Sequence, residues 1–162
     1  MKANELLALL REFHRDKLAM YLRHVAAARL VSDYDFNNTY QYVIAREDMH
    51  VAWLRDAILD MSGTPEEVPE PDIRQQGKGE SAQKAVITQD RDGASEFVTK
   101  WRARLEKVTH ARHKTMMDVI IGETLEHKRF FEQALAGRTD LLGRRADGAG
   151  TGGGVLPTRW VG

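Results

Sequence analysis

The pair Glu47 and His50 is the part of this sequence best suited to chemistry. Two side chains three residues apart on a helix point the same way, so a carboxylate and an imidazole at this spacing can bind one metal ion. Apolar residues at helical spacing surround the pair, which places both side chains on the core-facing side of the helix. An ionised carboxylate that is buried without a partner costs several kcal/mol. The position of Glu47 therefore predicts a cation beside it.

The composition limits the partners that the protein can have. The chain has 162 residues, enough for one domain, and 24 Lys plus Arg balance 24 Asp plus Glu, so no net charge favours nucleic acid or an anionic membrane. The absence of cysteine leaves nitrogen and oxygen as the only strong metal ligands. No apolar run is long enough to cross a membrane, and the N-terminus lacks a signal-peptide pattern. We therefore expect a cytoplasmic protein that binds neither nucleic acid nor membrane.

Hydrophobic periodicity predicts four long helices. The first runs from 4 to about 30, and the second follows a short turn with capping residues, from about 36 to 61. Gly and Pro then punctuate a polar crossover, and helical spacing returns from about 81 to 135. A single helix of that last length would measure about 80 Å, too long for a domain of this size. We therefore predict that it folds back at a turn over residues 109–114.

These elements predict an all-α fold in a single domain at residues 1–142. Its architecture is an antiparallel four-helix bundle built from two helical hairpins, which a long crossover joins. Residues 143–162 are rich in glycine and are expected to form a flexible tail. The tail ends in a short apolar peptide at residues 155–162, which either docks to a partner protein or folds back onto the bundle through Trp160.

The two predicted hairpins form an internal repeat. Shifting the chain by 76 residues superimposes apolar positions of the second hairpin on those of the first. Polar residues suited to metal binding coincide as well, in three pairs: Glu47 with Glu123, His50 with Glu126, and His14 with Asp90. The spacing within each hairpin is the same, so the pairs are expected at similar heights on facing helices. One ligand group from each helix would then converge at the centre of the bundle.

In these features the sequence resembles the ferritin-like superfamily, in particular bacterioferritin and rubrerythrin. Bundles of that family hold two metal ions with one Glu from each of two helices and a Glu-x-x-His pair from each of the other two. The resemblance covers about residues 4–137. It depends on three segments, which are Tyr21-Leu22-Arg23-His24, Glu47-x-x-His50 and Glu123-Thr124-Leu125-Glu126-His127-Lys128-Arg129-Phe130.

Three positions depart from the family pattern. His14 and Asp90 stand where the resemblance implies Glu, and Glu126 stands where it implies His, with His127 one residue further on. The carboxylates and imidazoles together would suit iron, with manganese or zinc as alternatives. The candidate metal ligands are His14, Glu47, His50, Asp90, Glu123, Glu126 and His127. With His127 in place of Glu126, the site would be less negative and would favour one ion over two.

The resemblance implies a metal-binding, non-haem di-iron or manganese protein that acts on ferrous iron with dioxygen or peroxide, as a ferroxidase or peroxidase-type oxidoreductase. Glu47 and Glu123 would be the bridging catalytic carboxylates, and the protein would form a homo-oligomer, a dimer or larger. One alternative is a ferritin-like scaffold or cargo protein with a degenerate metal site, bound to a partner or shell through residues 155–162. Another is a diiron-type oxidase or hydroxylase of a small organic substrate.

Overall fold

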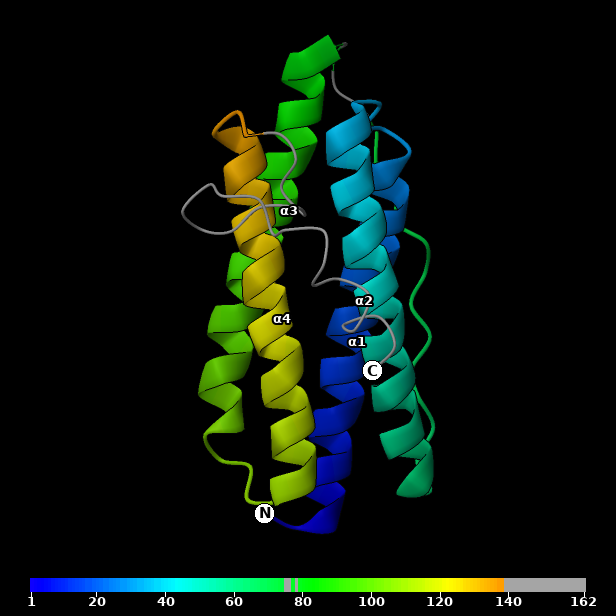
Figure 1. The fold of residues 1–162 in the computed structure, drawn as a ribbon. Coiled ribbons are helices and arrows are strands. Elements are labelled where there is room, and N and C mark those ends of the chain that lie inside the picture. The colour runs from blue at the N-terminus through cyan, green and yellow to red at the C-terminus, as the bar shows by residue number, and fades with distance from the viewer. Residues whose placement is uncertain (75–76, 78, 139–162) are drawn as a thin grey trace, which may run out of the picture.

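Four helices pack into one bundle in the computed structural model, which describes residues 1–74, 77 and 79–138 (Figure 1). They are α1 (Ala3–Ala28), α2 (Tyr34–Asp60), α3 (Gly79–Leu105) and α4 (Ala111–Leu135). Helix α1 packs mainly on α2, and α3 packs mainly on α4, so the chain forms two hairpins. From the end of α2, residues 61–74 run along the outside of the bundle toward its other end (Figure 1). The predicted all-α bundle of two hairpins with a long crossover is confirmed.

Two predictions bear on other parts of the chain. None of the described helices is long and apolar enough to cross a membrane. The predicted tail, with its apolar peptide at 155–162, lies outside the residues that the structure describes. Its docking to a partner stays a prediction.

The turn between α3 and α4 is shorter, and begins earlier, than the predicted turn at 109–114. Helix α3 ends at Leu105 and α4 begins at Ala111, so residues 111–114 form the first turn of α4. The Nδ1 atom of His110 accepts a hydrogen bond from the backbone N–H of His113 at 3.4 Å, which caps the helix. Val108 is buried in the core and anchors the turn. The polar side chains that suggested a loop are therefore those of a helix end.

Local contacts fix both ends of α2. At its start, the side chain of Asp33 accepts a hydrogen bond from the N–H of Phe36 at 3.1 Å. After its end, Ser62 has a φ of 61°, and the N–H of Gly63 donates to the carbonyl of Ile58 at 2.9 Å. A Cβ atom at Gly63 would lie 2.5 Å from Cδ1 of Leu7. Glycine at this position therefore allows α1 to approach the end of α2 closely.

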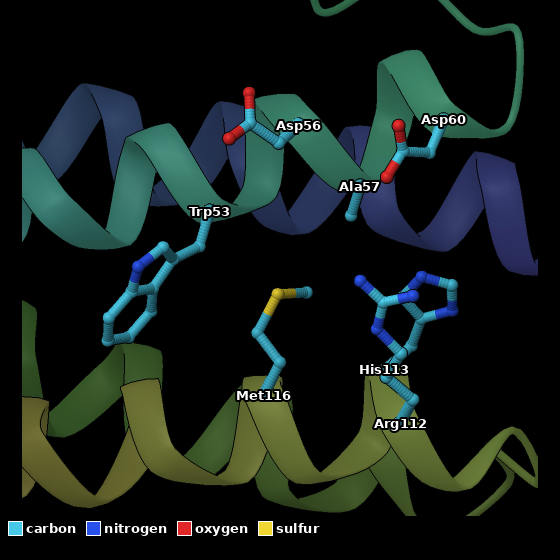
Figure 2. A pocket seen from close by; sticks show the side chains of 7 residues that line it. All are labelled: Trp53, Asp56, Ala57, Asp60, Arg112, His113 and Met116. Atoms are coloured by element: carbon cyan, nitrogen blue, oxygen red, sulfur yellow. The ribbon is translucent and has the colours of Figure 1, made fainter.

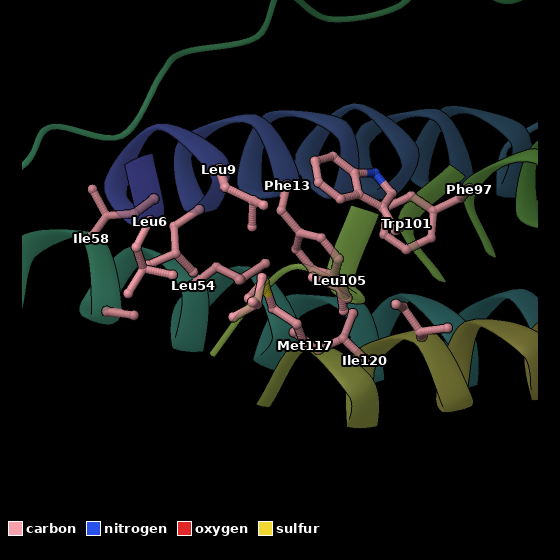
Figure 3. Packing of buried hydrophobic residues seen from close by; sticks show 14 of the residues in the cluster. Leu6, Leu9, Phe13, Leu54, Ile58, Phe97, Trp101, Leu105, Met117 and Ile120 are labelled. Carbon is pink, nitrogen blue, oxygen red and sulfur yellow. The ribbon is translucent and has the colours of Figure 1, made fainter. Parts of the chain in front are cut away.

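The core of the bundle consists of two apolar clusters with a polar layer between them. One cluster, shown in Figure 3, lies toward the turn between α3 and α4 and contains Phe13, Leu54 and Trp101. The other lies toward the opposite end and contains Tyr40 and Phe131. Between the two clusters, every helix contributes buried polar side chains, which are His14, Lys17, His24, Glu47, His50, Asp90, Thr124 and His127. We call these eight residues the polar layer.

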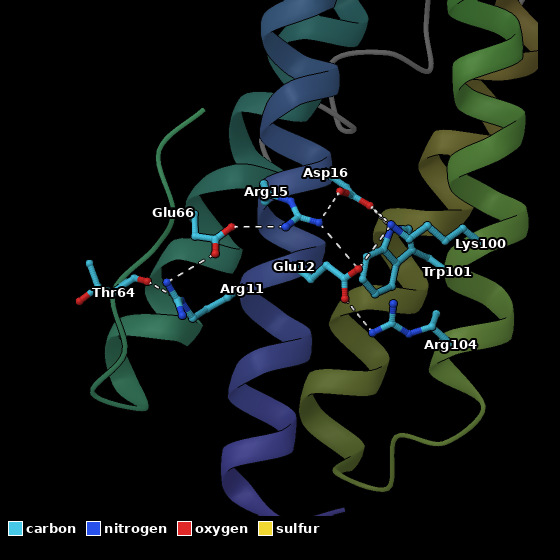
Figure 4. Close-up of polar contacts among 9 residues, drawn as sticks. All are labelled: Arg11, Glu12, Arg15, Asp16, Thr64, Glu66, Lys100, Trp101 and Arg104. Atoms are coloured by element: carbon cyan, nitrogen blue, oxygen red, sulfur yellow. Dashed lines mark hydrogen bonds and ion pairs between the residues drawn. The ribbon is translucent and has the colours of Figure 1, made fainter. Parts of the chain in front are cut away.

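A group of surface ion pairs joins α1 to α3 outside the core (Figure 4). Arg104 donates to Glu12 at 2.8 Å, and Lys100 donates to Asp16 at 2.6 Å. The indole Nε1 of Trp101 also donates to Asp16, at 3.0 Å. Ion pairs that stay exposed to solvent contribute at most about 1 kcal/mol each. They orient the two helices, while the stability of the bundle comes from its core.

Candidate functional site

Glu47 is the centre of the polar layer, and protein cations surround it. Its side chain is fully buried on α2. One carboxylate oxygen lies 2.8 Å from Nζ of Lys17, and the other contacts Nδ1 of His24. Burial raises the pKa of Glu47, but the charges of His24 and Lys17 outweigh that effect and hold the pKa well below its usual value. The cation that the sequence required beside Glu47 is present, and it belongs to the protein itself.

Lys17 touches all four helices from the middle of the bundle. It lies on α1, is fully buried, and pairs with Glu47 on α2. Its Nζ donates to the hydroxyl of Thr124 on α4 at 2.9 Å and lies 5.2 Å from the ring centroid of Phe97 on α3. The sulfur of Met20 is a further acceptor at 3.5 Å. The ammonium group therefore donates hydrogen bonds to Thr124 and Met20, and it forms an ion pair with Glu47, whose Oε2 has no hydrogen-bond partner in the described chain.

Asp90 on α3 is also paired within the protein. Its carboxylate accepts a hydrogen bond from Nε of Arg23 at 2.9 Å and another from the hydroxyl of Tyr40. Nε2 of His24 lies 3.7 Å away, so His24 stands between the two buried carboxylates of Glu47 and Asp90. Burial alone would lower the pKa of His24, but Glu47 and, beyond it, Asp90 raise that pKa above its usual value.

A second pair in the layer joins α2 to α4. Nε2 of His50 lies 2.7 Å from a carboxylate oxygen of Glu123, and Nε of Arg46 donates to the other oxygen at 2.6 Å. The ring of His127 stacks near His50, with the centroids 6.3 Å apart. Burial, with the nearby charge of Lys17, lowers the pKa of His50 to about 4 and that of His127 to about 3. Both imidazoles are therefore neutral at pH 7, and both have a buried Nδ1 without a hydrogen-bond partner in the described chain.

Two of the seven predicted ligands lie apart from these groups. His14 is buried on α1, but the charged groups that influence its pKa most are Arg55 and Glu66, not the carboxylates of the polar layer. Glu126 is exposed on the outer side of α4, and its neighbour His127 is the residue that enters the core. The structure therefore places every predicted ligand except Glu126 in or beside the polar layer, but it does not join them in one cluster of metal ligands.

The polar layer does not fit a dinuclear metal centre. In the described part of the chain, no three His, Asp or Glu side chains come together as a group that could hold a metal ion. The chemistry of the donors gives the reason, because Glu47 is bonded to Lys17 and His24, and Asp90 to Arg23 and Tyr40. A cationic ammonium repels a metal ion and offers it no lone pair.

Sequence reasoning missed Lys17 and Thr124, and it did not include His24 among the candidate site residues. A signal for Lys17 was present, since it lies four residues after Phe13 and seven before His24, within the apolar stripe of the first helix. A lysine at such a position is rarely buried unless it is paired. Together with the requirement of Glu47 for a cation, this would have indicated an internal ion pair.

Comparison with known proteins supports the fold. No protein-family model and no curated protein matches the sequence. Among solved structures, a ferritin-like diiron-carboxylate protein from Bacillus anthracis str. Ames is similar with a TM-score of 0.65 at 17% identity, over 83% of this chain and 99% of that one. A bacterioferritin from Rhodobacter capsulatus, described with a metal-free dinuclear site and haem iron, gives 0.64 at 16% identity, over 82% and 84%. The chain has the ferritin-like type of four-helix bundle fold.

The buried neutral histidines make the stability sensitive to mild acid. In the unfolded chain His50 and His127 have pKa values near 6.5, whereas in the folded protein these are about 4 and about 3. Between these values the unfolded state binds protons that the native state excludes, so stability falls as the pH drops from about 6.5. Urea unfolding from pH 6 to pH 5 should show this, and His50→Gln or His127→Gln should each reduce the slope by about 1.4 kcal/mol per pH unit. An unchanged slope in both variants would contradict the conclusion that His50 and His127 stay neutral in the folded protein.

Proposed function

We propose that this protein is a ferritin-like scaffold whose bundle is held together at its centre by an internal salt-bridge network in place of a metal centre. The observation that carries the proposal is the ammonium group of Lys17, which forms an ion pair with Glu47 and donates a hydrogen bond to Thr124 in the middle of the bundle. An ammonium neutralises a buried carboxylate, but it has no open coordination position and no accessible redox state. These properties suit a structural role.

The network also supports a scaffold role through the elements that it connects. Lys17 joins α1 of the first hairpin to α4 of the second. Arg23 and Tyr40, both in the first hairpin, bind Asp90 in the second, and His50 binds Glu123 across the same divide. Buried, hydrogen-bonded charge pairs hold their helices in one register, because any shift leaves a charge unpaired. In this proposal the rigid bundle presents a partner-binding segment, for which residues 155–162 are the candidate, and it does so as a homo-oligomer.

The proposal predicts a protein that is stable without metal. Protein purified without added metal should contain less than one equivalent of iron, manganese or zinc, and treatment with a chelator should leave its melting temperature unchanged. A bound ion at 100 times its Kd would stabilise the fold by about 2.7 kcal/mol, a contribution that thermal unfolding detects readily. Elemental analysis combined with melting curves before and after chelation tests this. One or two tightly bound equivalents, whose removal lowers the melting temperature, would contradict the scaffold.

The second candidate is a metal-binding oxidoreductase, and a specific observation favours it. His50 and His127 are neutral, adjacent and each has an unpartnered Nδ1, while Glu123 lies beside them at the edge of the core. Neutral imidazole and carboxylate are ligands for iron, manganese and zinc. Anaerobic titration with Co(II), which gives absorption bands in a protein site, separates the two functions. Bands that disappear in both His50→Gln and His127→Gln would favour this candidate.

A further inference from the structure

A cavity of about 300 Å³ lies outside the polar layer, between the C-terminal end of α2 and the N-terminal end of α4 (Figure 2). Acidic residues Asp56 and Asp60 come from α2, and the basic residues Arg112 and His113 come from α4. Trp53 and Met116 supply apolar surface between them. The volume is at the small end of the range for ligand pockets, about 300 to 1,000 Å³, so it suits a small molecule.

The charged groups at this cavity are not paired with each other. In Figure 2 the carboxylate of Asp60 points across the gap toward the guanidinium of Arg112, yet the two form no ion pair. Neither forms a hydrogen bond or ion pair with any other residue that the structure describes. The Nδ1 atom of His113 is shielded from solvent and also has no partner there. A positive and a negative group therefore face one cavity from opposite walls, and no described residue pairs with either of them.

Asp60 and Arg112 each lie at a helix end whose partial charge has the same sign as their own. Asp60 is the last residue of α2, where the partial negative charge of the helix end repels a carboxylate. Arg112 is in the first turn of α4, where the partial positive charge repels a guanidinium. No basic residue in the last turn of α2 and no acidic residue in the first turn of α4 compensates. Each residue is thus placed unfavourably with respect to its helix dipole, and a bound group that carries both charges would compensate both.

We propose that this cavity binds a small zwitterion, namely a free α-amino acid with an apolar or aromatic side chain. The ammonium group of the ligand pairs with Asp60, its carboxylate pairs with Arg112, and its side chain packs against Trp53 and Met116. A simple amine leaves the guanidinium unpaired, and a simple carboxylic acid leaves Asp60 unpaired. Asp60 and Arg112 are exposed in the free protein, but a ligand that covers one of them without supplying the opposite charge takes it out of water unpaired, so the site discriminates against both analogues.

Titration calorimetry with L-phenylalanine on the full chain tests this proposal, with 2-phenylethylamine and 3-phenylpropionate as analogues that each lack one charge. A ligand of this size is expected to bind with a Kd of about 1 mM or tighter, and each analogue about tenfold more weakly. Asp60→Asn and Arg112→Gln should each weaken L-phenylalanine about tenfold, since each removes one charge-assisted pair. The exposed Asp118→Asn on α4 and Arg102→Gln on α3 are matched controls and should bind as the wild type does.

A stability measurement separates lost binding from lost folding. Because Asp60→Asn and Arg112→Gln remove charges that the helix dipoles disfavour, both variants should melt at the wild-type temperature or slightly above it. Weaker binding by a variant that is at least as stable as the wild type supports the site. The proposal is overturned if L-phenylalanine gives no saturable heat, if an analogue with one charge binds as tightly as the amino acid, or if both variants bind like the controls.

Discussion

Replacing Lys17 with methionine is expected to lower the free energy of unfolding by about 3 to 5 kcal/mol. The substitution keeps the length and the apolar stem of the side chain, so little packing is lost. It removes the cation that lies 2.8 Å from Glu47 and the hydrogen bond to Thr124, in a layer where both partners are fully buried. A buried carboxylate that loses one of its two charge partners either stays ionised at high cost or takes up a proton. Urea unfolding at pH 7 measures the loss.

A matched lysine at the surface provides the control for this experiment. Lys100 pairs with Asp16 at 2.6 Å, but both side chains are partly exposed, so Lys100→Met should cost no more than about 1 kcal/mol. The double variant Lys17→Met, Glu47→Gln should recover part of the loss, because it removes the charge that Lys17→Met leaves unpaired. Equal effects of the two single substitutions would show that burial gives the Lys17 pair no special weight.

Replacing Lys17 with glutamate is expected to make the stability of the protein depend on a divalent metal ion. The new carboxylate would face Glu47 near the neutral imidazoles of His50 and His127, so a set of nitrogen and oxygen ligands would replace the ammonium. Two carboxylates in one buried site repel each other, so the metal-free variant should be less stable than the wild type. Added Mn(II) or Zn(II) at 100 times its Kd should restore about 2.7 kcal/mol, measured as a rise in melting temperature.

The specificity of that result depends on comparison with a neutral variant. Lys17→Gln removes the same ammonium without adding a ligand charge, so its melting temperature should not respond to Mn(II) or Zn(II). The wild type should not respond either, because its layer is already neutralised by Lys17 and His24. If Lys17→Glu behaves like Lys17→Gln in both metals, the ammonium does not occupy the position of a metal ion, and its role is confined to packing and charge balance.

Much of the fold follows from the sequence because helix formation is encoded locally. The apolar stripes around Leu10, Leu54, Trp101 and Ile120 follow the 3.6-residue period, and Gly and Pro mark the crossover. The turn before α4 was misplaced because side chains at a helix start are as polar as those of a loop. The requirement of buried Glu47 for a cation was also evident from the sequence, since the cost of burying a charge does not depend on the fold.

The identity of that cation was decided only by the tertiary structure. Periodicity shows which face of a helix is buried, but the rotation and height of one helix against another determine which side chains meet. Equal spacing in the two hairpins suggested that His14 and Asp90 would join Glu47 and Glu123. In the folded bundle, Glu47 instead pairs with Lys17. The long, flexible side chain of Lys17 on α1 reaches across the core to the carboxylate on α2 and to the hydroxyl of Thr124 on α4. The sequence determined that a charge had to be neutralised, and the packing of four helices decided that Lys17 neutralises it together with His24.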